Sequence, residues 1–221
     1  MSFPFAIVGF DLDGTLADTA GDLSAAVNHA LVLAARAPLT EAKVRPVIGL
    51  GARHMLEQGF AATGGIPGGD FERLYRELLR FYEAHIAVHS RVFPGLIAAL
   101  DRLDTLGVKT AVVTNKREDM ARKLLGELGL ADRMATIIGG DTLGAGNAKP
   151  SPAPIIEMVA RCGGGRAAFV GDSIYDVTAA NCAGVTSIAV SFGFLDRPAD
   201  ELDADHVIDH FDDLVPLLTR L

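Results

Sequence analysis

Several features that would assign the chain to other classes of protein are missing from its 221 residues. Its two cysteines, Cys162 and Cys182, are too few for a disulfide framework and lack metal-type pairing with histidine. We expect small, buried, free thiols in a reducing compartment. No apolar run approaches the roughly 18 residues of a membrane span. The start, FPFAIVGF, lacks the basic leader and cleavage site of a signal peptide. These absences predict a cytoplasmic protein with no membrane partner.

Long runs of charge of one sign are also missing. The chain has 28 acidic and 20 basic residues and a net charge of -8, which argues against broad binding to nucleic acids or anionic membranes. Its length and its 49% hydrophobic content suit one sizeable domain, or a main domain with a smaller one inserted. The sequence does not distinguish a monomer from a homodimer.

The clearest local pattern is a short apolar run at residues 6–10 that stops at Asp11 and Asp13, followed by Gly14 and Thr15. Such a run is typical of a buried parallel strand. If the strand is central, its two carboxylates face the crevice where open α/β sheets bind ligands. Taken alone, the fragment is equally compatible with an Asp/Gly turn.

Helical patterns dominate the next part of the chain. Apolar residues recur at helical spacing after Thr19 and again at residues 40–48, 52–61 and 71–86, without a strongly β-like interruption. The segment TGGIPGGD at 63–70 predicts a flexible connector. We therefore predict an α-helical cap domain, residues 16–88, inserted after the first strand.

From Pro94 onward, helical and extended patterns alternate, which is typical of βα units. Strands are predicted at residues 109–114, 135–139, 166–171 and 186–190, with an edge strand at 206–208. Helices are predicted at residues 95–106, 117–128, 152–161, 174–183 and 211–218. The predicted fold class is α/β, with a Rossmann-like parallel-sheet core formed by residues 1–15 and 89–221.

Polar side chains follow the predicted strands, whose ends converge in a parallel sheet. They are Asp11, Asp13, Thr114, Asn115, Lys149, Asp172 and Asp176. Carboxylates crowded into one crevice repel each other unless a cation neutralises them, and an all-oxygen set suits Mg²⁺. Thr114, Asn115 and Lys149 supply the donors and positive charge that a transferring phosphoryl group needs. Each residue taken singly also fits a turn, a solvated charge or a helix cap.

The strings DLDGTLADT, VVTNK, AKPSP and VGDSIYD, in this order, resemble the four motifs of haloacid dehalogenase superfamily phosphatases. The resemblance covers nearly the whole chain. The longer strings IIGGDTL, AKPSPAP and VGDSIYDVTAANCAGV are similar to the phosphoglycolate phosphatase branch. An aspartate at position 13, which haloacid dehalogenases proper lack, favours phosphate chemistry.

This resemblance implies a Mg²⁺-dependent phosphomonoester hydrolase. Asp11 would be the nucleophile that forms an aspartyl-phosphate, and Asp13 the general acid and base. Asp11, the backbone carbonyl of Asp13 and Asp172 would hold Mg²⁺, with Asp176 acting directly or through water. The phosphoryl oxygens would be bound by Thr114, Asn115 and Lys149.

Substrate choice is predicted to lie in the cap, in the segment GLGARH at residues 49–54. Arg53 can form bidentate bonds to a carboxylate, with His54 assisting and Arg45 a weaker candidate, although Arg53 also fits a solvent-facing arginine at a helix start. The expected partner is a small phosphorylated metabolite, 2-phosphoglycolate above others. The alternatives are another small phosphate such as a sugar phosphate or pyrophosphate, a phosphosugar mutase, and a non-catalytic phosphate-binding regulatory module.

Overall fold

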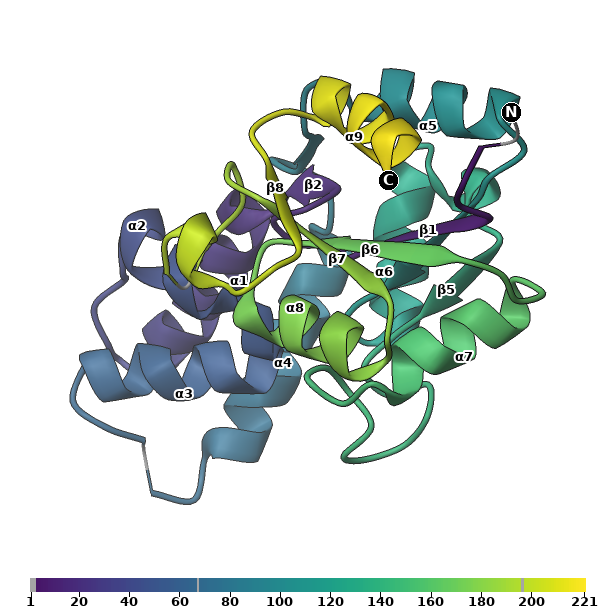
Figure 1. Cartoon of the computed structure of the whole chain (residues 1–221). Helices are drawn as coiled ribbons and strands as arrows, with labels where there is room; N and C mark the ends of the chain where they lie inside the picture. Colours follow the sequence, from purple (N-terminus) through teal and green to yellow (C-terminus); the bar gives the residue numbers. More distant parts are fainter. Residues whose placement is uncertain (1–2, 67, 196) are drawn as a thin grey trace.

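The computed structural model describes residues 3–66, 68–195 and 197–221. Within these ranges, six strands form a parallel sheet in the order β5-β4-β1-β6-β7-β8 (Figure 1). The strands are β1 (Ile7–Phe10), β4 (Lys109–Val113), β5 (Thr136–Ile138), β6 (Ala167–Gly171), β7 (Thr186–Val190) and β8 (His206–Ile208). The predicted α/β class is confirmed, and β1 lies between β4 and β6.

Helices cover both faces of this sheet, as a parallel sheet requires. Helices α5 (Leu96–Thr105) and α9 (Leu214–Arg220) lie on one face with α6 (Glu118–Glu127), and α7 (Ala153–Arg161) and α8 (Ile174–Cys182) cover the other (Figure 1). Side chains of β1 alternate between the two faces of the sheet. Val8 and Phe10 belong to the buried cluster that includes α5, α6 and α9, and Ile7 belongs to the cluster that includes α7 and α8. A Cβ at Gly9 would collide with Met158 of α7, so this glycine allows the close approach of the helix.

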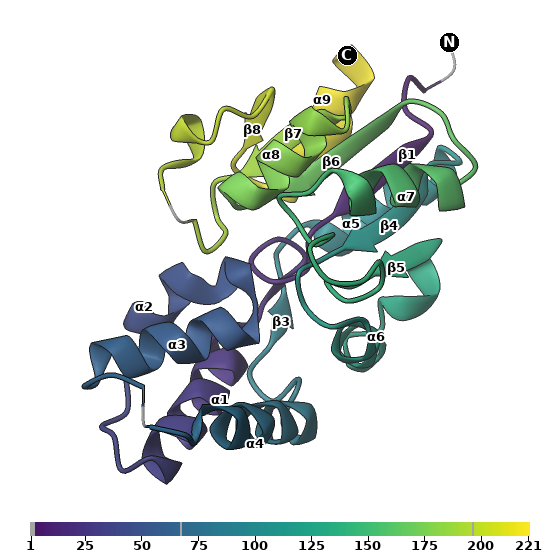
Figure 2. The ribbon, with the colours of Figure 1, turned by 90° about the horizontal axis from the view of Figure 1, so that it is seen from below.

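Four helices form a separate group beside the end of the sheet where β1 stops (Figure 2). They are α1 (Ala20–Leu33), α2 (Glu41–Val44), α3 (Ala52–Ala62) and α4 (Phe71–Ala84), with a 3₁₀ turn at Arg45–Leu50. Pro46 stands at the start of that turn, and the helix predicted at 40–48 is therefore divided between α2 and the 3₁₀ turn. The connector predicted at 63–70 contains residue 67, which lies outside the described residues.

A two-stranded antiparallel ribbon joins the helical group to the sheet. It pairs β2 (Ala17–Asp18) with β3 (Arg91–Val92). This ribbon was not predicted from the sequence, because strands of two residues are too short to show a strand periodicity. Close to it, the buried Asp22 carboxylate accepts hydrogen bonds from the backbone N–H groups of His89 and Ser90, both 2.9 Å long. The entry and exit of the helical group are therefore held together.

Cys162 is a buried free thiol as predicted, whereas Cys182 is exposed, because it ends α8 on the outer surface. No helix within the described part of the chain is long and apolar enough to cross a membrane.

Candidate active site

The loop after β1 brings Asp11 against the loop after β6. The Asp11 N–H donates to the carbonyl of Val170 over 2.9 Å, which continues the β1–β6 pairing to the end of the sheet. Gly14 has a φ of +86°, and a Cβ there would collide with the Asp172 carboxylate. Glycine is therefore required at this position both for backbone conformation and for space.

Three buried carboxylates lie close together where these two loops meet. One oxygen from each of Asp11, Asp172 and Asp176 lies within 4.8 Å of the other two. Burial raises the pKa of Asp11 to about 7, with Lys149 opposing that rise and Asp176 adding to it. Burial, with the charges of Asp176 and Asp11, also raises the pKa of Asp172 well above its usual value. The cluster therefore holds more negative charge than its surroundings neutralise.

Lys149 is the cation of this cluster. Its Nζ lies 2.8 Å from Asp11 Oδ1 and 2.5 Å from Asp176 Oδ1. Burial favours the neutral amine, but the two carboxylates outweigh it and raise the pKa of Lys149. The side chain is therefore a buried ammonium that points at the nucleophile predicted from the sequence.

The donor set fits a divalent cation. One ammonium against three buried carboxylates leaves negative charge that a hard cation with oxygen ligands would neutralise. Asp176 is the most heavily engaged of the three: its Oδ2 accepts from the N–H and the hydroxyl of Ser173, and its Oδ1 from Lys149. Asp11 and Asp172 are consequently the better candidates for direct contact with a metal.

Asp13 lies in a different environment from Asp11. It pairs with Lys116, whose Nζ is 2.8 Å from the carboxylate, and it accepts a 2.7 Å hydrogen bond from the Thr19 hydroxyl. Burial acts to lower the pKa of Lys116, but Asp13 raises it above the usual value. Lys116 was not among the residues predicted from the sequence, although its position directly after Asn115 in VVTNK, just past β4, was an available signal.

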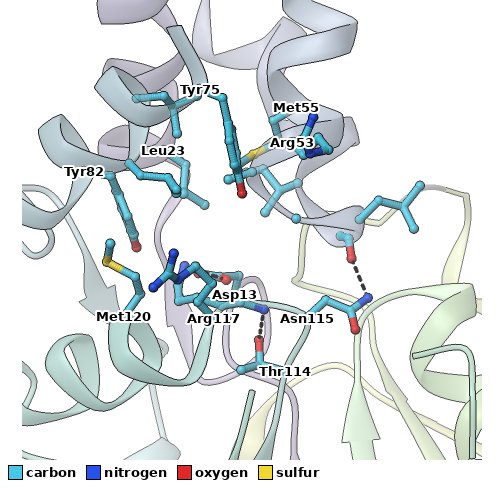
Figure 3. Close-up of a pocket in the computed structure, with 18 of the residues that line it drawn as sticks. Asp13, Leu23, Arg53, Met55, Tyr75, Tyr82, Thr114, Asn115, Arg117 and Met120 are labelled. Atoms are coloured by element: carbon cyan, nitrogen blue, oxygen red, sulfur yellow. Dashed lines mark hydrogen bonds and ion pairs between the residues drawn. The ribbon is translucent and has the colours of Figure 1, made fainter. Parts of the chain in front are cut away.

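Thr114 and Asn115 occupy the end of β4 but make different contacts. The buried Thr114 hydroxyl oxygen accepts from the Lys116 N–H over 3.2 Å, which leaves its own hydrogen able to donate to a ligand. The Asn115 amide donates to the carbonyl of Gly49 over 3.2 Å (Figure 3) and to the carbonyl of Lys149 over 3.0 Å. Its side chain therefore links the helical group to the sheet, so the phosphate contact predicted for Asn115 would have to come from its backbone N–H.

A cavity of about 170 Å³ lies between the sheet and the helical group (Figure 3). Asp11, Asp13, Thr114 and Lys116 line it on the side of the sheet. Its lining from the helical group is mainly apolar and aromatic: Leu23, Ile48, Met55, Tyr75, Leu78, Leu79 and Tyr82. The arrangement places the predicted nucleophile Asp11, a second carboxylate and two ammonium groups near one small cavity.

The arginines and the histidine predicted for substrate choice are divided between two cavities. Arg53 lines the main cavity but is paired with Glu72 through two bonds of 2.9 and 3.0 Å, with its guanidinium 4.7 Å from the Tyr75 ring centroid. His54 and Arg45 line a smaller cavity of about 50 Å³ beside Asp172. Arg45 also lies 4.7 Å from the centroid of Phe194, so it joins the helical group to the sheet domain.

Comparisons with known proteins agree with the motif resemblance. The family of haloacid dehalogenase-like hydrolases matches residues 8–190. The phosphoglycolate phosphatase of Agrobacterium fabrum is 43% identical over 97% of this chain and 92% of that protein. The one from Caulobacter vibrioides is 40% identical over 95% and 89%. A crystal structure of a predicted phosphoglycolate phosphatase from Haemophilus somnus, 27% identical, superposes with a TM-score of 0.91 over 97% of this chain and 98% of that one. The chain therefore belongs to the haloacid dehalogenase-like hydrolases.

Proposed function

We propose that the protein is a Mg²⁺-dependent phosphatase that hydrolyses 2-phosphoglycolate to glycolate and phosphate. The observation that carries this proposal is the contrast between two neighbouring carboxylates. Asp11 lies with Lys149 in the carboxylate cluster, whereas Asp13 is held apart by Lys116 and Thr19. Two carboxyl groups in different environments suit two chemical roles. The relatives named phosphoglycolate phosphatase support the choice of substrate.

Asp11 is the nucleophile in this proposal. Its carboxylate attacks phosphorus, the bond from phosphorus to the ester oxygen breaks, and an aspartyl-phosphate forms. Asp13 gives a proton to the departing glycolate oxygen and then takes one from the water that hydrolyses the aspartyl-phosphate. The Lys116 and Thr19 contacts fix the orientation of Asp13 between these two steps.

The phosphoryl oxygens are bound by the Thr114 hydroxyl, the Lys149 ammonium and the backbone N–H of Asn115. Mg²⁺ would be held by Asp11, the backbone carbonyl of Asp13 and Asp172, with Asp176 acting through water. The ion would neutralise charge on the phosphoryl oxygens. Asp172 is oriented by the Phe194 N–H and the Thr15 hydroxyl, at 2.6 and 3.3 Å.

Residues 16–88 form the cap in this proposal, and residues 1–15 with 89–221 form the catalytic core. Arg53 of the cap would bind the substrate carboxylate after leaving Glu72, with His54 assisting from the neighbouring cavity. The cavity volume of about 170 Å³ lies below the roughly 300–1,000 Å³ of pockets for drug-sized ligands, which favours a small phosphorylated metabolite. The cytoplasmic location stays a prediction from the sequence.

The proposal is tested by phosphate release from a panel of esters with the purified protein and Mg²⁺. The panel contains 2-phosphoglycolate, ethyl phosphate, glucose 6-phosphate, pyrophosphate and 4-nitrophenyl phosphate. We expect the highest kcat/KM on 2-phosphoglycolate. A higher value on pyrophosphate or the sugar phosphate would move the assignment to that substrate, and no release from any ester would favour a regulatory phosphate-binding module.

A further inference from the structure

Tyr82 of α4 is a buried side chain whose hydroxyl hydrogen is unused. The residue is 3% exposed, and within the described part of the chain its hydroxyl has no hydrogen-bond acceptor. The Lys116 ammonium, which can only donate, interacts with the hydroxyl oxygen. Tyr82 lines the main cavity, and its hydroxyl end points from α4 toward the sheet side (Figure 3). Buried polar groups in folded proteins almost always have a partner, so the group that completes this contact is expected to be a ligand.

The surroundings of Tyr82 define what that ligand group must be. Burial raises the pKa of Tyr82 to about 12, with Lys116 opposing the rise, so at neutral pH the hydroxyl is protonated and can donate. The Lys116 ammonium lies 4.7 Å from the centroid of the Tyr82 ring. A hydrogen-bond acceptor that carries negative charge would satisfy the hydroxyl and also interact favourably with this ammonium.

The protein itself offers poor acceptors at this position. Asp13 lines the same cavity, but its carboxylate already interacts with Lys116 and Thr19. Leu23, Leu78 and Met120 also line the cavity and are apolar. The Tyr82 hydroxyl is therefore a donor that is already shielded from bulk water before a ligand binds. It lies at a cavity with room for a small molecule.

We propose that the Tyr82 hydroxyl is a specificity-determining donor to the carboxylate of the bound substrate. This inference rests on the proposed function. The sheet side of the cavity holds the phosphoryl group at Asp11, and Tyr82 comes from the helical group, so a substrate with a phosphate at one end and a carboxylate at the other bridges the two. In contrast to Arg53, which is half-exposed and already paired with Glu72, Tyr82 has no acceptor among the described residues that it would have to leave.

The test compares Tyr82→Phe with the wild type on 2-phosphoglycolate and on ethyl phosphate, which has a methyl group in place of the carboxylate. Phenylalanine keeps the ring over Lys116 and removes only the oxygen. We expect kcat/KM on 2-phosphoglycolate to fall by about 10- to 100-fold, as for loss of one hydrogen bond to a charged group. The value on ethyl phosphate should change by less than about threefold.

Ser24→Ala is the matched control, because the buried Ser24 hydroxyl of α1 also lacks a hydrogen-bond partner within the described residues but does not line this cavity. It should leave both substrates nearly unchanged. Equal losses on both substrates in Tyr82→Phe, or no loss on either, would overturn the role of Tyr82. A wild-type enzyme that does not prefer 2-phosphoglycolate over ethyl phosphate would instead contradict the proposed function itself, together with the carboxylate contact.

Discussion

Lys116 and Asp13 form an ion pair of 2.8 Å that is almost completely shielded from solvent, with 6% and 12% of the two side chains exposed. The pair joins the loop after β4 to the loop after β1, which are 103 residues apart in the sequence. It is the contact that distinguishes the environment of Asp13 from that of Asp11.

Replacing Lys116 by methionine tests this pair, because the length of the side chain is kept and its charge is lost. The substitution leaves a buried carboxylate without its cation, so we expect the free energy of unfolding to fall by ~3–5 kcal/mol. We also expect kcat to fall, since Asp13 loses its orientation. Urea unfolding and phosphate release measure the two effects.

Two variants serve as controls for this prediction. Lys116→Arg keeps the charge and should recover most of the stability. Lys123→Met removes a lysine of α6 that bonds the Glu83 carbonyl in an exposed contact, and it should change both quantities little. A Lys116→Met protein as stable and active as the wild type would show that the ion pair has no role.

The proposed division of labour between Asp11 and Asp13 predicts different losses in two isosteric variants. Asp11→Asn should abolish turnover, because an amide is not a nucleophile and cannot carry the phosphoryl group. Asp13→Asn should lower kcat by the 10²–10⁴-fold typical of general acid–base catalysis. Phosphate release near the wild-type rate in Asp11→Asn would refute the aspartyl-phosphate route.

The carboxylate cluster predicts that stability without metal decreases as the pH rises. The pKa of Asp11 is about 7 in the folded protein, and its ordinary value of 3.8 applies to the unfolded chain. Between these pH values the folded state holds a proton that the unfolded chain has lost. The stabilising contribution is complete below pH 3.8 and is lost as the pH passes about 7. The contribution of Asp11 should therefore make the Tm measured in a chelator lower at about pH 8 than at about pH 5.

Added Mg²⁺ should reverse this trend, because metal and proton compete for the same oxygens. We expect Mg²⁺ to raise Tm more at about pH 8 than at about pH 5, and to restore activity after chelation. Asp172→Ala should reduce both effects. Full activity in excess chelator, with no metal found by elemental analysis, would contradict the metal site.

Arg53 is predicted to contribute to substrate choice only after leaving Glu72. Arg53→Ala should lower kcat/KM on 2-phosphoglycolate more than on 4-nitrophenyl phosphate, by an amount corresponding to ~1.5–3 kcal/mol for a bond to a charged group. Glu72→Gln keeps the guanidinium and weakens its present pairing, so it should leave that preference intact or increase it. Equal losses on the two esters in Arg53→Ala would place Arg53 in cap closure rather than in specificity.

The sequence by itself determined the kinds of elements and most of the chemistry-bearing residues. The apolar run before Asp11 and the βα alternation after Pro94 are local patterns, and local patterns record which face of an element is buried. The structure has strands at each of the predicted positions in the core and helices close to those predicted there. Asp11, Asp172 and Lys149 could be selected because side chains after parallel strands converge at one edge.

Only the tertiary structure decided which of these side chains meet. Lys116 pairs with Asp13 and Asn115 bonds Gly49 across sequence separations of 103 and 66 residues, and no periodicity records such contacts. The same holds for the two-residue ribbon, and for Tyr82, which no motif in the sequence singles out. Its hydroxyl becomes a buried donor without an acceptor, among the residues that the structure describes, only when α4 packs over the cavity. Burial and hydrogen bonding are properties of the assembled fold.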